Sequence, residues 1–337
     1  MMTTMTNKPR FRAVILAGGS GERFWPLSTP EKPKQFLRVF GGESLIRQSV
    51  LRLQGLVPAS DVFVVTSKDL VAATRRELPE LPRENVLGEP MRRDTGAAVA
   101  LGVGVAGRED DAVVGFFPAD QMVTNAKAFA ACVKKAIAQA RKSEAVVTLG
   151  IKPEYPATGF GYVDPKTGRF VEKPDEKKAR QYLKKGYLWN AGMFIARAAT
   201  FRAAFASYAP ALAPLAAAGA KGLSSAALAK AYAALPRISF DFAVMEKLPR
   251  VAVVAADCGW DDVGSYGAFD RYFPHDSRGN VREGPCTVVE ADGNICIARS
   301  SRISLLGVKD LVVVTTPDAV LVADKSRLGD IKKLLAK

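Results

Sequence analysis

The residues best placed to do chemistry lie near the N-terminus. Apolar residues 13–17 lead into a loop with three glycines, and the cations Arg23 and Lys34 follow soon after. An apolar run that breaks into glycines is typical of a buried strand entering a loop whose backbone amides can approach phosphate oxygens. Cationic side chains beside such a loop would neutralise phosphate charge. The segment therefore predicts a nucleoside-triphosphate site.

The glycine loop differs from the two commonest phosphate-binding loops. Residues 19–24 lack the third glycine of a dinucleotide-binding fingerprint, and the chain has no Walker-type Gly-Lys-Ser/Thr sequence. Pro26 prevents a helix from starting directly after the glycines, as a Rossmann turn requires. We therefore expect an open loop that lies across its ligand.

Two acidic segments also follow apolar runs. Asp120 comes just after residues 112–117, and Asp261 and Asp262 come after residues 251–255. Carboxylates suit Mg²⁺, which takes one or two of them from a protein and completes its coordination with phosphate and water. Alternatively, each aspartate caps a helix or shapes a turn. The acidic segments predict a metal site where they meet the glycine loop.

Apolar runs of strand length alternate with helix-length segments over the first half of the chain. The runs are residues 13–17, 62–66, 86–88, 112–117 and 145–150. Buried strands separated by amphipathic helices predict an α/β fold, in which a mostly parallel Rossmann-like sheet is sandwiched by helices. Ligands of such sheets bind at the carboxyl ends of the strands. The loops that leave the first, third and fourth runs should therefore converge on one site.

The chain changes character after residue 276. Short alternating stretches lie at residues 286–290, 295–298, 303–306, 311–315 and 320–323, and residues 328–335 are helix-like. This pattern predicts a small β-rich C-terminal module. We expect two domains, at residues 1–276 and 277–337.

Composition excludes several classes of function. The 337 residues carry a net charge of +14, but the cations are spread along the chain without interleaved aromatic residues, so we expect no nucleic-acid partner. No apolar stretch is long enough to span a bilayer, and the N-terminal segment lacks a secretory hydrophobic region, which predicts a cytoplasmic protein without a membrane partner. The four cysteines lack metal-ligand spacing, and a single histidine disfavours histidine-based metal chemistry.

Several motifs together resemble the sugar-1-phosphate nucleotidylyltransferase family. Trp25-Pro26-Leu27-Ser28 and Pro33-Lys34-Gln35-Phe36-Leu37 are similar to its branch that joins GTP and mannose 1-phosphate, and the resemblance runs from residue 13 to about 325. It implies that GTP and α-D-mannose 1-phosphate give GDP-mannose and diphosphate, by in-line attack of the sugar phosphate on the α-phosphorus. It further implies Mg²⁺ as cofactor, a catalytic domain at residues 1–276 and a short β-helix-like module after it. A homodimer is compatible with it.

The resemblance also implies roles for single residues. Arg23 would contact the β- and γ-phosphates, Lys34 the α-phosphate or the sugar phosphate, and Asp120 and Asp262 would hold the metal. Glu89 would accept hydrogen bonds from guanine N1 and N2. The nucleotide-binding residues would be Leu16, Gly18, Gly19, Gly21, Glu89 and Thr95, and the sugar-binding residues Gly161, Glu172, Lys173 and Asn190.

The sequence departs from the family pattern in four places. Gln121 replaces a His, Asp94 an Asn, Gly96-Ala97 an Ala-Pro, and Ala191 a Ser. These changes leave the details of base and sugar contacts open. Asp241 either caps the helix expected at its position or supports the sugar site.

Two other functions stay open at this stage. One is another hexose-1-phosphate nucleotidylyltransferase, which would use glucose 1-phosphate, UTP or dTTP. The other is a noncatalytic nucleotide-sugar sensor built on the same fold. A sensor should lack one of the cations beside the glycine loop or one of the carboxylates expected to hold the metal. All four residues, Arg23, Lys34, Asp120 and Asp262, are present.

Overall fold

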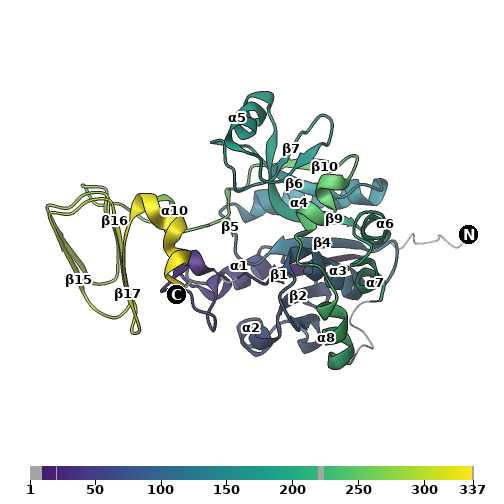
Figure 1. Cartoon of the computed structure of the whole chain (residues 1–337), viewed down its shortest axis with the longest axis horizontal. Coiled ribbons are helices and arrows are strands. Elements are labelled where there is room, and N and C mark those ends of the chain that lie inside the picture. Colours follow the sequence, from purple (N-terminus) through teal and green to yellow (C-terminus); the bar gives the residue numbers. More distant parts are fainter. Residues whose placement is uncertain (1–9, 20, 219–223, 336–337) are drawn as a thin grey trace, which may run out of the picture. The chain divides into compact units, whose positions relative to one another are not determined.

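The computed structural model describes residues 10–19, 21–218 and 224–335 (Figure 1). Contacts within the chain form two compact units. The first unit takes in the chain up to Gly18, Ser49–Ala119 and Val123–Trp260, and the second takes in Gly19–Gln48, Asp120–Met122 and Asp261–Lys337. The units interleave along the sequence, so the division at residue 276 stays a prediction.

A mixed, mostly parallel sheet forms the centre of the first unit (Figure 1). Its strand order is β10-β6-β9-β4-β1-β2-β3. The bounds are β1 Phe11–Ala17, β2 Val62–Ser67, β3 Val86–Glu89, β4 Val113–Pro118, β6 Val147–Ile151, β9 Leu188–Arg197 and β10 Ala252–Ala256. β1 runs parallel to β2 and β4, whereas β9 is antiparallel to β4 and β6. The predicted fold class is confirmed, with β9 as an antiparallel strand inside the sheet.

Helices cover both faces of this sheet. Side chains alternate between the faces of a strand, and in β4 Phe116 packs against Phe201 of α6 while Phe117 packs against Phe129 of α4. The helices are α2 Val71–Glu77, α3 Asp94–Ala106, α4 Ala126–Lys142, α5 Glu176–Lys185, α6 Ala198–Tyr208, α7 Ala213–Ala218, α8 Ser225–Ala233 and α9 Phe240–Ala243. α3 is apolar on all sides because it is buried between the sheet and α6, α7 and α9.

Short elements complete the first unit. The hairpin of β7 and β8 extends the sheet from β9. Its bounds are β7 Tyr162–Val163 and β8 Phe170–Val171. The 3₁₀ helices are η3 Ala59–Asp61, η4 Lys68–Leu70, η5 Arg83–Asn85 and η6 Met245–Lys247, and the short strands β5 Met122–Val123 and β11 Trp260–Asp261 lie where the chain passes between units.

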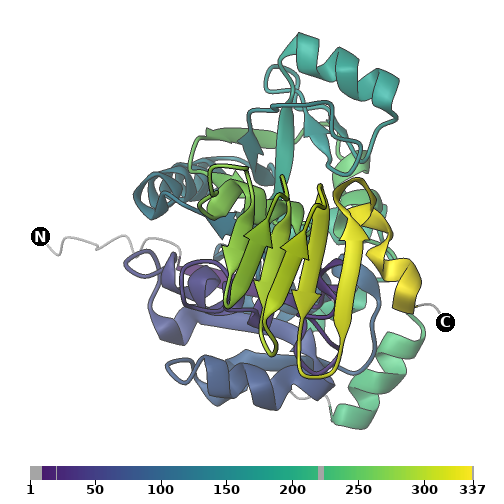
Figure 2. The same ribbon diagram turned by 90° about the vertical axis from the view of Figure 1, so that its left-hand side faces the viewer.

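The second unit contains the β-rich module predicted for the C-terminus (Figure 2). Parallel pairs join β12 to β14 and β14 to β16, β17 is antiparallel to β16, and β13 pairs with β15. The bounds are β12 Val281–Glu283, β13 Cys286–Val289, β14 Ile295–Ala298, β15 Ile303–Leu306, β16 Leu311–Thr315 and β17 Val320–Asp324. η1 Glu22–Phe24, η2 Lys34–Phe36, α10 Gly267–Tyr272 and η7 Lys325–Leu335 also belong to this unit, and α1 Leu45–Leu51 begins in it.

One hydrophobic core joins the two ends of the second unit. Phe24 and Phe40, from the segment that follows the glycine loop, are buried with Val312 and Ile331 from the C-terminal strands and η7. The ring of Phe24 packs on Tyr266 at a centroid distance of 5.3 Å. Burying one such aromatic side chain stabilises the fold by about 2 kcal/mol. The residues after the glycine loop are therefore held by the C-terminal part of the same unit.

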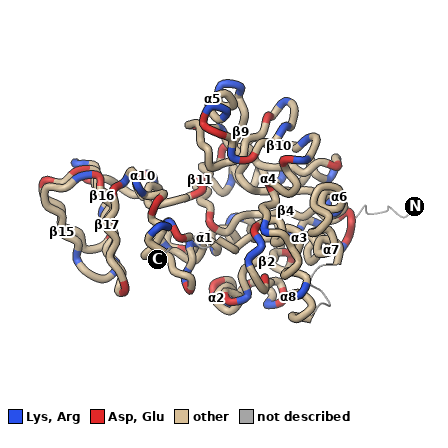
Figure 3. The backbone as a smooth tube through the Cα atoms, in the orientation of Figure 1, with Lys and Arg blue, Asp and Glu red and all other residues tan. Residues whose placement is uncertain are grey.

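Lysine and arginine occur along the whole described chain rather than in one run (Figure 3). Within residues 10–19, 21–218 and 224–335, no helix has the length and apolar character needed to cross a membrane.

Candidate functional site

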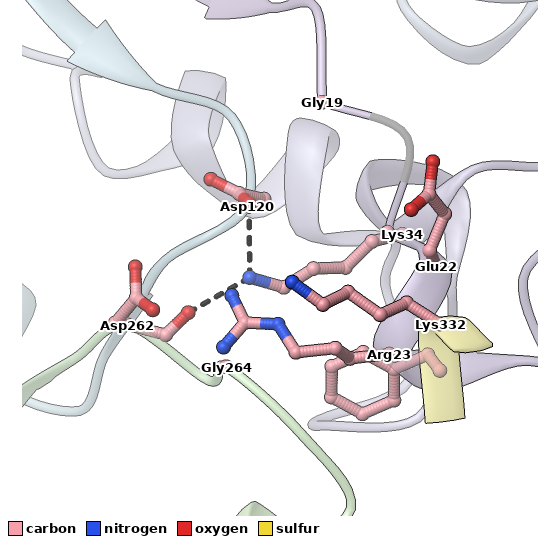
Figure 4. Close-up of a pocket in the computed structure, with 10 residues that line it drawn as sticks. Gly19, Glu22, Arg23, Lys34, Asp120, Asp262, Gly264 and Lys332 are labelled. Atoms are coloured by element: carbon pink, nitrogen blue, oxygen red, sulfur yellow. Dashed lines mark hydrogen bonds and ion pairs between the residues drawn. The ribbon is translucent and has the colours of Figure 1, made fainter. Parts of the chain in front are cut away.

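A cavity of about 260 Å³ in the second unit collects the charged residues that the sequence singles out (Figure 4). Arg23 and Lys34 reach it from η1 and η2, and Asp120 and Asp262 reach it from the segments that follow β4 and β11. We call this cavity the phosphate pocket. Its lining residues are Gly19, Gly21, Glu22, Arg23, Phe24, Lys34, Asp120, Asp262, Gly264 and Lys332.

Lys34 is the buried centre of the phosphate pocket. Its side chain is 7% exposed, and Nζ donates hydrogen bonds to Asp120 Oδ2 at 2.9 Å and to the backbone oxygen of Asp262 at 2.8 Å (Figure 4). The ammonium group thus links the two segments that carry the carboxylates. A third N–H of this group stays available for a ligand, since an ammonium has three donors.

Gly21 allows the glycine loop to lie directly on Lys34. Its φ of 68° is in the left-handed region, which favours glycine. A Cβ at this position would lie 2.4 Å from Lys34 Cβ and 2.7 Å from its backbone nitrogen. Any other residue would therefore push the loop and the lysine apart.

Gly264 leaves similar room for Arg23. A Cβ on Gly264 would lie 3.3 Å from Arg23 Nη1 and 3.1 Å from Asp262 Oδ2. Because Gly264 has no side chain, the Arg23 guanidinium and the Asp262 carboxylate can both lie close to its backbone. Burial raises the pKa of Asp262, and the nearby Lys34 and Arg23 oppose that shift.

The two neighbouring aspartates have different partners. Asp261 accepts a hydrogen bond from the Val263 backbone at 2.7 Å and forms an ion pair with Arg271 at 2.6 Å, so it shapes the turn. Asp262 faces the phosphate pocket. The helix-cap alternative for Asp120 is wrong, because β5 follows it and the next helix, α4, is capped by Asn125.

The donor set of the pocket fits Mg²⁺ bound together with a nucleotide. Asp120 and Asp262 both present carboxylates to it. No group of three or more metal-binding side chains occurs within the residues that the structure describes. Mg²⁺ needs only one or two protein carboxylates when phosphate and water supply its other ligands.

The predicted base-contact residues lie in the first unit. Glu89 ends β3 and is 8% exposed, and its Oε1 accepts a hydrogen bond from Tyr232 of α8 at 3.3 Å. Burial raises the pKa of Glu89 to about 7. A Cβ on Gly18 would lie 3.7 Å from Glu89 Oε2, so the ends of β1 and β3 meet. The Leu16 oxygen is already bonded to the Ala119 nitrogen.

The start of α3 explains two departures from the family pattern. Asp94 has a φ of 64°, a conformation that Asp and Asn tolerate better than most residues. Gly96 donates from its backbone to the Ile238 oxygen at 3.0 Å, and a Cβ would lie 2.6 Å from that oxygen. Thr95 Oγ1 accepts a hydrogen bond from the Phe240 backbone at 2.9 Å. Its hydroxyl proton stays available to a ligand.

The predicted sugar residues also meet in the first unit. The Asn190 backbone donates to the Gly161 oxygen at 2.8 Å, and a Cβ on Gly161 would lie 2.6 Å from Glu172 Oε2. Lys173 Nζ forms an ion pair with Glu172 Oε1 at 2.8 Å. Glycine at 161 therefore lets Glu172 and Asn190 sit side by side.

Asp241 belongs to this cluster and does not cap a helix. The cap of α9 is Ser239, whose Oγ accepts from the Phe242 nitrogen at 3.2 Å. Asp241 instead accepts a hydrogen bond from Asn190 Nδ2 at 3.0 Å. Burial, with the nearby carboxylate of Glu172, raises the pKa of Asp241 to about 7. We call Glu172, Asn190 and Asp241 the buried carboxylate network.

Sequence reasoning missed several residues of these sites. Tyr232 bonds Glu89, and Thr148 donates to Asn190 Oδ1 at 2.7 Å. Lys332 lines the phosphate pocket from η7. Tyr232 stands alone in an alanine-rich helix and Lys332 in a lysine-rich tail, so neither carried a motif. The strand alternation around residue 148 could have pointed to Thr148, since a polar residue inside a buried strand needs a partner.

The fold and the pocket together define a class of protein. A mostly parallel sheet, a glycine loop at the end of β1, and a cavity lined by three cations and three carboxylates are suited to binding a polyphosphate together with a metal ion. The chain belongs to the nucleotidyl transferase family, whose model matches residues 12–278. A second model, the MannoseP isomerase/GMP-like beta-helix domain, matches residues 284–337.

Several similar proteins have names that refer to mannose 1-phosphate. A mannose-1-phosphate guanylyltransferase of Escherichia coli K12 is 35% identical over 96% of this chain and 72% of its own length. One from Klebsiella pneumoniae is 36% identical over 95% of this chain and 72% of its own length. A solved structure described as mannose-1-phosphate geranyltransferase from Thermus thermophilus matches with a TM-score of 0.88 and 35% identity, over 97% of this chain and 98% of that one. The predicted family is confirmed.

Proposed function

We propose that the protein transfers the guanylyl group of GTP to α-D-mannose 1-phosphate, forming GDP-mannose and diphosphate. The convergence of Arg23, Lys34, Asp120 and Asp262 on one pocket carries this proposal. A noncatalytic sensor has no need for this complete set of charges. The names of the similar proteins support the choice of substrates.

The phosphate pocket would act through position and charge. An oxygen of the sugar phosphate attacks the α-phosphorus in line, the bond from that phosphorus to the bridging oxygen breaks, and diphosphate leaves with the bonding electrons. The transition state gains negative charge on the phosphoryl oxygens, which preorganised cations stabilise. Lys34, fixed by its two hydrogen bonds, would serve the α-phosphate, and Arg23 the departing diphosphate.

Asp120 and Asp262 are the residues that would hold Mg²⁺. When bound, the ion would offset charge on the phosphate oxygens. The hydrogen bond from Lys34 to Asp120, at 2.9 Å, would hold that carboxylate in place beside the pocket.

The buried groups of the first unit would supply selectivity. Glu89 would accept hydrogen bonds from the N1 and N2 hydrogens of guanine, and the Thr95 hydroxyl would donate a hydrogen bond to the nucleotide. Gly161, Glu172, Lys173 and Asn190 would bind the mannose phosphate. A sugar hydroxyl both donates and accepts hydrogen bonds, and Asn190 keeps one amide hydrogen beyond its bond to Asp241.

Diphosphate release with Mg²⁺ tests the proposal, with GTP, ATP, UTP and dTTP crossed against mannose 1-phosphate and glucose 1-phosphate. We expect turnover with GTP and mannose 1-phosphate, its loss on metal chelation, and its recovery on adding Mg²⁺ back. Asp120→Asn should abolish most of the activity. Asp257→Asn, a carboxylate outside the lining of the pocket, is the control.

Other outcomes would change the proposal in different ways. Preference for another nucleotide or sugar would keep nucleotidyl transfer and overturn this substrate pair. Absence of turnover with every pair, together with tight binding of a nucleotide sugar, would favour the sensor.

A further inference from the structure

Lys332 lines the phosphate pocket, although it lies outside the motifs that the sequence analysis singled out. It lies on η7, near the C-terminal end of the described chain, and its side chain points into the space occupied by Arg23 and Lys34 (Figure 4). All three cations belong to the second unit.

The backbone around Lys332 is anchored. Leu328 and Ile331 of η7 are 7% and 3% exposed and pack in the same core as Phe24. Arg23 directly precedes Phe24, and Lys332 directly follows Ile331. Each cation is therefore the chain neighbour of a residue that is fixed in one hydrophobic core, so packing of that core brings the backbones of the two cations to the same pocket.

Lys332 differs from the neighbouring cations of η7, because those cations form ion pairs. Lys333 and Arg327 both pair with Asp330, at 2.7 and 2.6 Å. Within residues 10–19, 21–218 and 224–335, neither Lys332 nor Arg23 has an ion-pair partner within 4.0 Å. Like charges that face one cavity repel each other unless an anion lies between them. The arrangement is suited to a polyanion with charge at more than one position.

We propose that Lys332 is a further phosphate-binding residue of this site and contacts the β- and γ-phosphates of the bound triphosphate, and hence the diphosphate product. Lys34 contacts both metal-carboxylate segments, whereas Lys332 and Arg23 have no such bonds and share the rest of the pocket. The identity of the triphosphate rests on the proposed function, but the anion site itself does not.

This position predicts a selective effect on substrates. Lys332→Ala should weaken binding of the ligands that carry a diphosphate end, which are GTP and diphosphate. It should leave the KM for mannose 1-phosphate unchanged. The phosphate of that substrate attacks the α-phosphorus from the side opposite to the leaving diphosphate, so it would not contact Lys332. A residue that merely supported the fold would change all of these together.

Calorimetric titration of the full chain with inorganic diphosphate, in buffer with Mg²⁺, tests the anion site without any turnover. We compare the wild type with Lys332→Ala, Lys332→Arg and the matched control Lys333→Ala. Loss of one charge-assisted contact should weaken diphosphate binding about 10-fold in Lys332→Ala. Lys332→Arg should recover most of the affinity, and Lys333→Ala should bind like the wild type.

The outcomes separate the two proposals. Lys332→Ala that binds diphosphate like Lys333→Ala, at an unchanged melting temperature, would overturn the role of Lys332, and so would a wild type that binds no diphosphate. Diphosphate binding that depends on Lys332 in a protein without turnover would uphold this inference and overturn the proposed reaction. A rise in the KM for GTP alone, matching the loss in diphosphate affinity, would support both.

Discussion

The phosphate pocket and the buried carboxylate network use acidic side chains in different surroundings. In the pocket, the Asp120 side chain is 33% exposed and touches the ammonium of Lys34. In the network, the Glu172 side chain is 5% exposed, and burial raises the pKa of both Glu172 and Asp241. In the pocket the two cations Lys34 and Arg23 oppose the effect of burial on the pKa of Asp262, whereas in the network the charge of Glu172 adds to the effect of burial on the pKa of Asp241.

The difference matches two kinds of recognition. A triphosphate carries several negative charges. Cations in a cavity that is partly exposed to water can attract it with little loss of hydration free energy. A sugar presents hydroxyl groups without charge, and buried directional hydrogen bonds distinguish one hydroxyl arrangement from another. Changes in the pocket should therefore affect rate, and changes in the network should affect stability and its dependence on pH.

Removal of the buried pocket cation should have the largest effect. Lys34→Ala takes away the group that links Asp120 to the Asp262 segment, and the rate of diphosphate release should fall about 100- to 1000-fold. Lys32→Ala is a matched control, since its side chain is exposed and lies outside the pocket lining. If both variants lost activity equally, general surface charge rather than the pocket would explain the rate.

Crowding the glycine loop should have the next largest effect. Gly21→Ala places a Cβ 2.4 Å from Lys34 Cβ, so the loop and the lysine must separate, and we expect at least about a 10-fold lower rate. Gly42→Ala has a similar positive φ, of 83°, but no atom lies within 4 Å of its new Cβ. Gly42→Ala therefore measures the loss of stability that a non-glycine residue causes at positive φ, about 1 kcal/mol, without the steric clash that Gly21→Ala adds. Kinetics and urea unfolding of both variants measure the two contributions.

Asp241→Asn should change how stability depends on pH. The raised pKa of Asp241 means that the folded protein holds a proton which the unfolded chain releases near pH 4. This contribution to stability is complete below about pH 4 and is lost as the pH rises to about 7. Between pH 5 and pH 8 the free energy of unfolding of the wild type should therefore fall by on the order of 2 kcal/mol relative to that of the variant.

Urea unfolding at several pH values measures that difference. Asp175→Asn changes an exposed aspartate that caps α5 and whose pKa is lowered by its bond to the Lys178 backbone. Its stability relative to the wild type should stay constant above pH 5. A constant difference for Asp241→Asn over the same range would contradict a buried, protonated aspartate.

Tyr232→Phe should have the smallest effect and tests whether Glu89 behaves like the network. The Tyr232 hydrogen bond lowers the pKa of Glu89, so its removal moves that pKa above about 7. An ionised Glu89 accepts hydrogen bonds from guanine better than a protonated one. The KM for GTP should therefore fall as the pH rises through about 7 in the wild type and at higher pH in the variant.

At pH 7.5 the KM for GTP of Tyr232→Phe should be about two- to threefold higher than that of the wild type. Tyr208→Phe, on α6, provides a control in which the bond to Glu89 is intact. An identical pH profile in all three proteins would remove Glu89 from the nucleotide site.

The same comparison shows what the sequence could predict. The pocket residues follow apolar strands at short spacing, so local patterns and family resemblance identified Arg23, Lys34, Asp120 and Asp262. The parallel sheet followed from the same alternation of apolar runs. The position of β9 between β4 and β6 did not, because pairing order depends on contacts between distant segments.

The network was harder to predict because burial decides its chemistry. Asp241 lies at a helix start, where a capping role is the ordinary expectation, but Ser239 takes that role and Asp241 turns toward Asn190. Lys332 and Tyr232 reach their sites through packing of η7 and α8, and packing leaves no signature at single positions.

The shared core of the second unit has a consequence for biosynthesis. Phe24 and Phe40 are buried against Val312 and Ile331, which lie far along the chain and are synthesised much later. Contacts between such distant segments form slowly, because a long loop must close first. During translation Phe24 and Phe40 should stay exposed until β16 and η7 emerge, and exposed apolar side chains of this kind are sites that chaperones bind. The phosphate pocket is thus completed only after η7, which carries Lys332, has been synthesised.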